Sequence, residues 1–528
     1  MLDCLAVRIR CYLPIGLTAF CLAAGGEVAP AQSTAKSASL TIRADQPGPQ
    51  ISRHIYGHFA EHLGRCIYDG LWVGPKSSIP NTRGIRNDVI EALRKIRIPN
   101  LRWPGGCFAD QYHWRDGVGP ADKRPKRTNI HWGNVVEDNS FGTHEFLDFC
   151  ELTGAEPYVA ANVGSGTPEE MMSWVEYMTF DGPSDVAHLR RANGREQPWK
   201  VPFLGIGNEN WGCGGRMTPE YYSDLYRRFS VYARDFGENR LTRVAAGPGG
   251  TELGWLEVLM KKVRGGMQGI SLHYYTLGNT WQDKLPATGF QEDGWAAVLR
   301  DALKMEDLLT RAEVIMERED PNNRVGLYVD EWGTWYQAEP GTNPAFLYQR
   351  NTIRDAVVAG ATLNILHHHA KRVRMANIAQ LVNVLQALIL TEGEKIVLTP
   401  TYHVFDMYQV HHDATSLPIE LKTDNYTHAE TVIPAVSASA SRDGQGRLHL
   451  SLVNLDPKAP VSLQARIEGE KFSKVSGQIL SGDTMDAENS FAAPSKLRPA
   501  PFEGAGLAGG ALTAQLPPRA VVVLTLAR

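Results

Sequence analysis

The sequence predicts an α/β protein, a (β/α)8 TIM barrel with a C-terminal antiparallel β-sandwich domain. Short apolar runs alternate with amphipathic stretches over most of the chain, as in strand–helix repeats. Two of these runs, 203–207 and 326–329, are followed closely by glutamates, Glu209 and Glu331. Residues 430–528 instead hold short alternating runs separated by turn signals, which is typical of antiparallel strands.

The barrel strands are expected in eight apolar runs. They lie at residues 55–59, 100–103, 157–161, 203–207, 243–246, 269–273, 326–329 and 361–366. Between them, apolar residues recur at helical spacing, as from Val89 to Ile96. Thr218 followed by Pro219 predicts the start of another helix, because threonine caps a helix and proline fits its first turn.

Composition divides the chain into four parts. Residues 1–31 are expected to be a signal peptide, and 32–52 a linker with an N-terminal strand that joins the sandwich. The catalytic barrel is expected at 53–400 and the sandwich at 401–528. The alternation of Ser39–Arg43 favours an edge strand.

The N-terminal residues resemble a secretory signal. Arg8 and Arg10 precede a mostly apolar run, residues 11–24, and Ala29–Ala31 forms a small-residue cleavage pattern. We therefore expect a secreted or periplasmic protein, with a retained N-terminal anchor as the alternative. No later segment is apolar for long enough to span a bilayer, so no membrane span is expected in the mature chain.

Charge and motifs exclude several classes of partner. The net charge of the 528 residues is −4, and the densest basic run, Lys123–Arg127, is short and broken by proline. We interpret it as a solvated loop, so nucleic acid is not an expected partner. The sequence holds no phosphate-binding loop or dinucleotide motif, and we expect no cofactor.

Neither the cysteines nor the histidines predict a metal site. Beyond the signal, Cys66, Cys107, Cys150 and Cys213 match no zinc spacing, and the sequence leaves open which pair, if any, forms a disulfide. Residues 367–369 are three consecutive histidines. On a strand such neighbours point to opposite faces and do not converge on one ion.

Two glutamates at strand ends suggest glycosidic bond cleavage. The C-terminal ends of barrel strands carry the chemistry, and a pair of carboxylates serves this reaction. Either glutamate alone is more often a capping or surface residue. The residues beside the two glutamates favour a role in sugar chemistry. Asn208 can hydrogen-bond a sugar, and Trp211 and Trp332 offer stacking surfaces.

Six motifs resemble the family 51 α-L-arabinofuranosidases. They occur in the same order here, at Ile55–Arg65, Arg102–Gly106, Gly207–Glu209, His273–Tyr275, Asp330–Trp332 and Ala379–Asn383. The resemblance implies a clan A retaining glycosidase that acts on terminal α-L-arabinofuranosyl groups of arabinan or arabinoxylan. Its members are often oligomeric, so a homo-oligomer is a further expectation.

The resemblance also implies roles for individual residues. Glu331, after strand 7, matches the nucleophile, and Glu209, after strand 4, matches the general acid/base. The remaining matches are substrate-binding or orienting residues: Glu61, Arg102, Asn208, His273, Tyr275 and Gln380. For Arg102 the alternative is a cap on barrel carbonyls, and for Asn208 a residue of a strand-end turn. We interpret His273 as a site wall rather than a base.

Cys107 departs from the family pattern, because many relatives have asparagine after Pro-Gly-Gly. A thiol is a weak donor, so Cys107 is expected to support the sugar mainly by packing. Trp132, Trp211 and Trp335 are candidate aromatic walls, with ordinary packing as the alternative.

Two other functions remain open at this point. The same barrel serves other clan A activities, such as an endo-β-glucanase or a xylosidase, which an open cleft would distinguish from a closed pocket. A non-catalytic carbohydrate-binding protein is the third hypothesis, which loss of either glutamate would favour; both glutamates are present.

Overall fold

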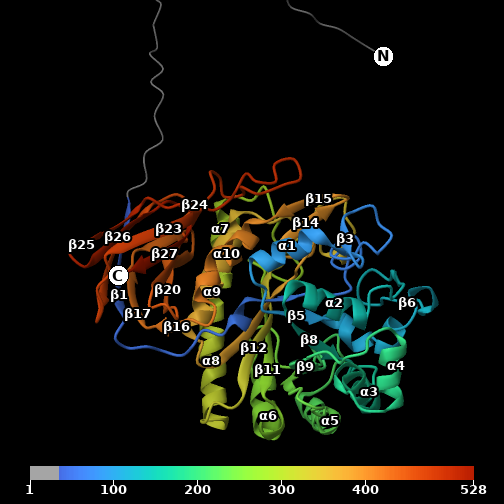
Figure 1. Ribbon diagram of the computed structural model, residues 1–528. Helices are drawn as coiled ribbons and strands as arrows, with labels where there is room; N and C mark the ends of the chain where they lie inside the picture. The colour runs from blue at the N-terminus through green and yellow to red at the C-terminus, as the bar shows by residue number, and fades with distance from the viewer. Residues whose placement is uncertain (1–34) are drawn as a thin grey trace, which may run out of the picture.

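The computed structural model describes residues 35–528, and its larger part is a closed barrel of eight parallel strands (Figure 1). Around the barrel the strands are β2 (Gly57–Phe59), β5 (Asn100–Trp103), β8 (Glu156–Ala161), β9 (Phe203–Ile206), β10 (Thr242–Ala245), β11 (Gly269–Thr276), β12 (Gly326–Thr334) and β13 (Val373–Ala379). Strand β13 pairs with β2 and closes the ring. The predicted (β/α)8 barrel is confirmed.

Helices connect the strands and surround the barrel. They are α1 (Asn87–Lys95), α2 (Thr143–Thr153), α3 (Pro168–Thr179), α4 (Asp185–Ala192), α5 (Pro219–Tyr232), α6 (Gly254–Val263), α7 (Glu292–Ala302), α8 (Lys304–Glu319), α9 (Ile353–His368) and α10 (Pro400–Tyr408). Helix α5 begins where the sequence predicts, with Thr218 accepting a hydrogen bond from the backbone N–H of Tyr221 and proline in the first turn.

The predicted eighth strand is wrong. Residues 361–366 lie inside α9, and the eighth strand is β13, seven residues beyond them. Helix α9 is buried at every position from Ile353 to His367. A helix that is buried on all sides shows no clear amphipathic period, so its apolar run at 361–366 resembles a buried strand.

Histidines 367–369 therefore lie at the end of a helix, whereas the sequence argument against a metal site placed them on a strand. They lie at the C-terminal end of α9 and bind different partners rather than one ion. His367 contacts Tyr56 and Ser439, whereas His369 contacts carboxylates of α8.

The C-terminal part is a two-sheet, mostly antiparallel sandwich beside the barrel (Figure 1). One sheet has the order β17 (Ile419–Thr423), β1 (Lys36–Arg43), β22 (Val461–Glu468), β26 (Ala511–Leu516), β25 (Ala505–Ala508). The other has the order β16 (Thr415–Leu417), β20 (Val436–Arg442), β21 (Leu448–Asn454), β27 (Val521–Ala527), β23 (Lys474–Leu480), β24 (Ala500–Pro501).

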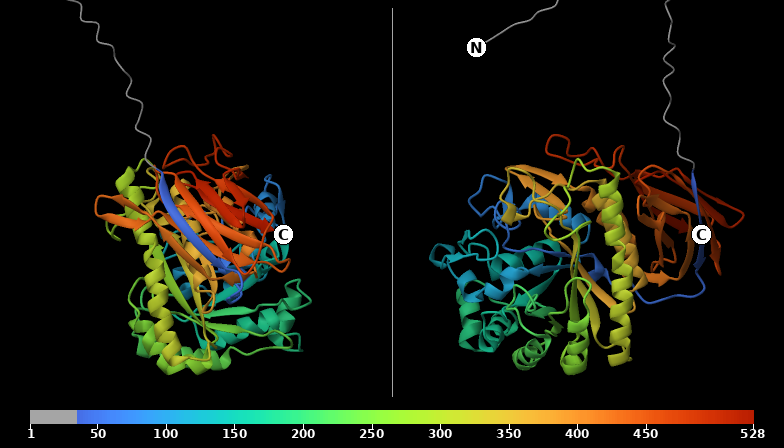
Figure 2. Two further views of the ribbon diagram at one scale, coloured as in Figure 1. Left: turned by 90° about the vertical axis from the view of Figure 1, so that its left-hand side faces the viewer. Right: turned by 180° about the vertical axis from the view of Figure 1, so that it is seen from behind.

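Strand β1 enters this sandwich from the other end of the chain (Figure 2). It pairs antiparallel with β17 and parallel with β22, so it is an interior strand and not the edge strand that its alternation favours. Leu40 and Ile42 point into the sandwich core.

Short hairpins complete the fold. They pair β3 (Asn81–Thr82) with β4 (Ile85–Arg86), β6 (Arg127–Thr128) with β7 (Val136–Glu137), β14 (Ile389–Glu392) with β15 (Lys395–Leu398), and β18 (Asn425–His428) with β19 (Thr431–Pro434). The β6–β7 hairpin flanks the loop that carries Trp132, and so positions a wall of the site.

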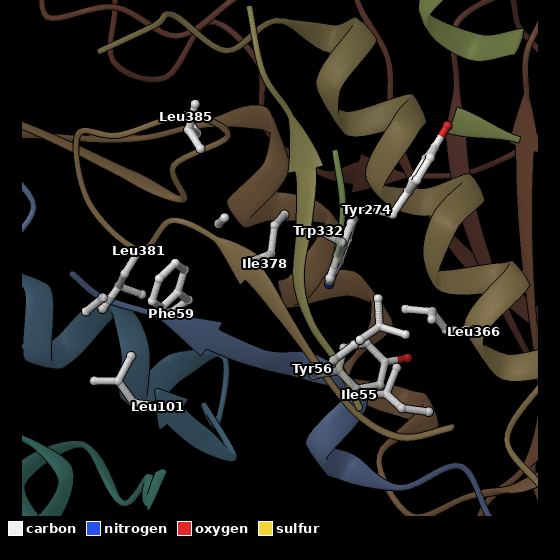
Figure 3. Close-up of a cluster of buried hydrophobic side chains, with 14 of the residues drawn as sticks. Ile55, Tyr56, Phe59, Leu101, Tyr274, Trp332, Leu366, Ile378, Leu381 and Leu385 are labelled. Atoms are coloured by element: carbon white, nitrogen blue, oxygen red, sulfur yellow. The ribbon is translucent and has the colours of Figure 1, made fainter. Parts of the chain in front are cut away.

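One continuous core joins the barrel to α9 and the sandwich. Figure 3 shows part of it, where Tyr56 and Leu366 lie beside barrel residues such as Trp332 and Ile378. Across the boundary, the indole of Trp295 donates a hydrogen bond of 2.9 Å to the carbonyl of Leu455. Within residues 35–528, none of the helices has the length and apolarity needed to cross a bilayer. The expected signal peptide lies outside the described residues.

Candidate active site

The loop after β9 and the second half of β12 bring Glu209 and Glu331 together at the C-terminal end of the barrel. Gly207 (φ 88°) and Glu209 (φ 41°) adopt left-handed backbone, which turns the chain sharply after β9. Glu331 lies within β12, whose nine residues are all buried. Carboxylate oxygens of the two glutamates lie within 4.8 Å of each other. The structure therefore places the two sequence-predicted carboxylates in one site.

Both oxygens of Glu331 accept hydrogen bonds from side chains predicted for this site. Nη1 of Arg102 donates to Oε1 at 2.7 Å, and the hydroxyl of Tyr275 donates to Oε2 at 2.8 Å. Gly106 makes room for this carboxylate, because a Cβ atom there would lie 2.9 Å from Oε1. The Gly-Gly of the sequence motif is thus a steric requirement of the site.

The charge on Glu331 is set by opposing effects. Burial raises its pKa, and the nearby Glu209 carboxylate raises it further. His273 and Arg102 act in the opposite direction, because adjacent cations favour the ionised form. Together these effects leave the pKa of Glu331 above its ordinary value.

His273 lies among three carboxylates. Its Nδ1 atom is 2.9 Å from Glu209 and 3.4 Å from Glu331, and its Nε2 atom is 3.1 Å from Asp330. Burial alone would lower the pKa of His273, but these carboxylates outweigh burial and raise it to about 10. The imidazole is therefore a cation at neutral pH, and more than the site wall that we expect from sequence.

Asp330 is a site residue that sequence reasoning missed. Its Oδ2 atom accepts a hydrogen bond of 2.8 Å from Tyr158 and lies 3.5 Å from Nε of Arg102. Burial would raise its pKa, but Arg102 and His273 outweigh burial and lower it. Asp330 is therefore ionised, and it pairs with both cations of the site, Arg102 and His273.

A bulge explains why Asp330 and Glu331 reach the same partners. Ser271 pairs with Tyr328 and His273 with Glu331, so β12 contains one extra residue relative to β11. Strict alternation would send neighbouring side chains to opposite faces. The extra residue lets both carboxylates contact Arg102.

Glu61 is a further buried carboxylate in the site. Its Oε1 accepts from the indole of Trp132 at 2.9 Å and from the N–H of Phe108 at 3.1 Å. Its Oε2 accepts from the amide of Gln380 at 2.9 Å. Burial is the main reason why its pKa rises to about 7. Both protonation states are therefore populated near neutral pH.

Asn208 is held from two sides. Its Oδ1 atom accepts a 2.5 Å hydrogen bond from Nη2 of Arg102, and its backbone N–H donates to Asp110 at 2.9 Å. Asp110 also accepts from the backbone N–H groups of Val163 and Gly164. Burial raises the pKa of Asp110 to about 7 against these donors. Asp110 lies 98 residues from Asn208, and no sequence spacing pointed to it.

The prediction that Cys107 offers a free thiol is wrong. Cys107 forms a disulfide with Cys213, which joins the loop after β5 to the loop after β9. Cys107 lines the site cavity, and Sγ of Cys213 lies 3.5 Å from Oε2 of Glu209. A disulfide has no S–H donor, so the bridge supports the site by packing and by joining two loops. Cys66 and Cys150 are buried free thiols.

The cavity above the two glutamates has a volume of about 440 Å³. Glu61 and Gln380 line it, together with the three predicted aromatic walls, Trp132, Trp211 and Trp335. Asn208, Arg102 and Asp330 support the lining from behind and are nearly fully buried. The arrangement is a pocket with polar groups converging at its buried end, which suits a small sugar.

Two groups of side chains have metal-like spacing among residues 35–528, but their chemistry does not fit an ion. One contains Cys107 and Cys213, whose sulfurs are joined to each other and form no thiolate. The other contains Glu209, His273 and Glu331. There the imidazole is protonated, so it offers no lone pair and itself supplies the positive charge.

Comparisons with known proteins identify relatives of this chain. A family model described as the α-L-arabinofuranosidase 1 domain matches residues 92–281, and one described as the α-L-arabinofuranosidase C-terminal domain matches residues 330–520. An intracellular exo-α-L-arabinofuranosidase from Bacteroides ovatus is 50% identical over 495 residues, covering 94% of this chain and 96% of the relative.

Solved structures of arabinofuranosidases are also similar to this chain. The GH51 arabinofuranosidase from Xanthomonas axonopodis pv. citri has a TM-score of 0.92 and 49% identity, and the match covers 93% of this chain and 100% of that chain. The α-L-arabinofuranosidase from Thermotoga maritima, solved as an arabinose complex, has a TM-score of 0.78 and 29% identity, covering 93% and 99%. A family 44 xyloglucanase from Paenibacillus polymyxa, 13% identical, shares the fold alone.

These findings correct the expected location. The Bacteroides ovatus relative aligns with nearly the whole chain and is named intracellular. This contradicts the prediction of a secreted or periplasmic protein. The signal peptide from which that prediction was drawn receives no support.

Proposed function

The chain belongs to the family 51 α-L-arabinofuranosidases, and on this basis we propose which of its residues carry out each part of the reaction. It is an exo-acting α-L-arabinofuranosidase that releases terminal arabinofuranosyl groups. We propose side chains of arabinoxylan or arabinan as its substrates. The barrel, at residues 53–400, would carry the site, and residues 401–528 would form the sandwich.

We assign the nucleophile to Glu331. Two donors, Arg102 and Tyr275, fix its carboxylate and favour its ionised form. Glu331 attacks the anomeric carbon as Glu209 gives its proton to the leaving oxygen, and a glycosyl-enzyme forms. Glu209 then removes a proton from water, which attacks the same carbon and releases arabinose. Two displacements at one carbon retain its configuration.

The reaction that we propose starts with a proton on Glu209, beside a cluster of four charged side chains. Arg102 and His273 are cations, whereas Asp330 and Glu331 supply two negative charges. The charges of these four side chains balance one another. When Glu209 loses its proton, Glu331 becomes neutral through its bond to the sugar, and the balance is kept.

The furanose would lie against Glu61, Gln380 and Asn208. Glu61 has a pKa of about 7, so it can either accept a hydrogen bond from a sugar hydroxyl or donate one. Gln380 donates to Glu61 through its amide, and its Oε1 is buried without a partner in the described residues. That oxygen is free to accept from a hydroxyl. The disulfide of Cys107 and Cys213 closes one wall.

The separation of the two carboxylates carries this proposal. Retaining enzymes hold them about 5–5.5 Å apart, and inverting enzymes about 6.5–9.5 Å apart. Oxygens of Glu209 and Glu331 lie within 4.8 Å of each other, which supports the shorter separation of a retaining enzyme. Proton NMR of the first-formed arabinose tests it. We expect the α anomer before mutarotation; initial β anomer would contradict a double displacement.

A further inference from the structure

His273 presents one ring nitrogen to a carboxylate on each of its two sides. Its Nδ1 atom lies 2.9 Å from Oε1 of Glu209, and its Nε2 atom lies 3.1 Å from Oδ1 of Asp330. An ionised carboxylate offers only lone pairs, so each nitrogen needs a proton of its own to be attracted at these distances. A neutral imidazole carries a single N–H, so the two contacts together select the imidazolium cation and neither contact does so alone.

Asp330 makes the second of these contacts from behind the site. Its side chain is 1% exposed and does not line the cavity. Among residues 35–528, neither its Oδ1 atom nor Nε2 of His273 has a well-aligned hydrogen-bond partner, so their contact is an ion pair. The other oxygen, Oδ2, faces two donors, the hydroxyl of Tyr158 at 2.8 Å and Nε of Arg102 at 3.5 Å. Asp330 therefore acts on the substrate only through other side chains.

Three carboxylates of the described residues face His273, from two elements of the barrel. Glu209 lies on the loop after β9, whereas Asp330 and Glu331 lie on β12. Arg102, on β5, is the cation that pairs with both carboxylates of β12. Glu209 and Glu331 carry the two reacting carboxylates of the proposed function. Of the three carboxylates, Asp330 is thus the one that can charge the imidazole without taking part in a bond to the sugar.

The charge on His273 acts when Glu209 gives up its proton. The Nδ1–H group donates to Oε1, so the proton of the acid form lies on Oε2 and departs from there. The proton moves to the leaving oxygen, which keeps the electrons of the broken C–O bond, and a negative charge forms on the carboxylate of Glu209. A hydrogen bond between ionised groups is roughly twice as strong as one between neutral groups. The imidazolium therefore stabilises this transition state more than a neutral imidazole does.

We propose that Asp330 is a positioning residue of the reaction, which keeps His273 charged so that the imidazolium stabilises the carboxylate that forms on Glu209. The inference rests on the proposed function, since it assigns part of the strength of the general acid to a residue that does not touch the sugar. Glycosides with poor leaving groups need the acid most, so their hydrolysis depends strongly on Asp330. Glycosides with good leaving groups depend on it little.

Asp330→Asn tests this role, because the side chain keeps its size and loses its charge. The position of Oδ2 faces two donors, so the amide oxygen takes that position and the amide NH2 group faces Nε2 of His273. The imidazole then accepts a hydrogen bond at Nε2 and is neutral. We expect kcat/KM on α-1,5-linked arabinotriose to fall about tenfold or more, and kcat/KM on a dinitrophenyl arabinofuranoside to change less than about threefold.

The pH–rate profile on arabinotriose gives a second kinetic readout. In Asp330→Asn two charges are lost, the carboxylate of Asp330 and the cation of His273. The cation lies nearer to Glu209, so its loss has the larger effect, and the general acid keeps its proton to higher pH. The basic limb of the profile should therefore move to higher pH.

NMR of the imidazole reads the charge of His273 directly. In protein with isotope-labelled histidine, the signals of His273 are those that His273→Gln lacks. We expect the charged form in the wild type from pH 5 to pH 8, because its pKa is raised to about 10, and the neutral form in Asp330→Asn at pH 7. A neutral His273 in the wild type at pH 7 overturns the proposal, even where Asp330→Asn does not fold.

Asp307→Asn is the matched control. Its carboxylate, on α8, is 72% exposed and does not line the cavity, so both rates and the basic limb should stay unchanged. In Asp330→Asn, equal losses on the two substrates with an unmoved basic limb and a charged His273 would show that Asp330 only packs the site, and the proposal fails. If the wild-type enzyme hydrolyses neither arabinofuranoside, the proposed function fails instead, and the charge of His273 is still measured by NMR.

Discussion

The hydroxyl of Tyr275 donates a hydrogen bond of 2.8 Å to Oε2 of Glu331, and Arg102 donates to the other oxygen. A protonated carboxyl would have to give up one of these two donors, so the pair favours the ionised form. The two donors also fix the plane of the carboxylate, which a nucleophile aimed at one carbon requires.

Tyr275→Phe should therefore lower kcat/KM about 10- to 100-fold, because a hydrogen bond to a charged group contributes about 1.5–3 kcal/mol. Loss of a donor that favours the carboxylate also raises the pKa of the nucleophile. The acid limb of the pH–rate profile should move to higher pH. A lower rate with an unmoved acid limb would indicate that Tyr275 acts only by packing.

Glu331→Ala should abolish turnover, because it removes the carboxylate that we assign as the nucleophile. Added azide or formate should restore activity on an activated aryl arabinofuranoside, since a small anion fits the vacated space. The expected product is the β-configured azide, identified by NMR. Near wild-type activity of the alanine variant without azide would exclude Glu331 as the nucleophile.

Glu209→Ala should affect substrates according to their leaving groups. General acid catalysis contributes about 10²- to 10⁴-fold, and a good leaving group needs little of it. We expect a large loss of kcat/KM on arabinotriose and a much smaller loss of kcat/KM on a dinitrophenyl arabinofuranoside, because kcat/KM reports the first displacement. Rates on both substrates are compared by steady-state kinetics, and equal losses would mean that Glu209 is structural.

The sequence was sufficient to predict the barrel and the two glutamates, because each glutamate follows an apolar run and strand ends of a barrel meet at one face. It was not sufficient for the eighth strand, since the buried helix α9 lacks the polar face that would reveal its period. The role of Asp330 depends on a bulge in β12, and that of Asp110 on a contact across 98 residues. Neither feature leaves a local pattern.

The sequence also did not predict the pairing of Cys107 with Cys213, because it allows several pairs of cysteines. The structure shows that the bridge joins residues 106 apart and lies beside Glu209. A disulfide that closes so long a loop typically stabilises a protein by about 2–4 kcal/mol. The double variant Cys107→Ser/Cys213→Ser should melt at a lower temperature and lose kcat/KM.

Dithiothreitol provides the control for the bridge. The reductant should lower the melting temperature and activity of the wild type and leave the double variant unchanged, because the other described cysteines are buried free thiols. Alkylation followed by mass spectrometry establishes whether the bridge has been reduced. A wild type that keeps its full activity and melting temperature after confirmed reduction would show that the bridge is dispensable.

Buried histidines between the barrel and the sandwich predict a loss of stability in acid. Burial lowers the pKa of His58 and of His367 to about 3, and that of His411 also lies well below its ordinary value. The unfolded chain binds protons near pH 6.5, so these groups stabilise the fold fully above that pH. The contribution is lost as the pH falls from 6.5 towards 3.

His367→Gln isolates one of these groups. His367 receives a hydrogen bond of 2.7 Å from Tyr56 if its Nε2 is unprotonated, and its Nδ1 lies 2.8 Å from Ser439 in the sandwich. Each such histidine adds about 1.4 kcal/mol per pH unit to the slope of unfolding free energy between pH 6.5 and its folded pKa. Urea unfolding at pH 7, 6 and 5 should therefore give a slope smaller by about that amount in the variant, whatever its stability at pH 7. An unchanged slope would show that His367 binds a proton as readily in the folded protein as in the unfolded chain, and that the contact between α9 and the sandwich does not depend on its neutral form.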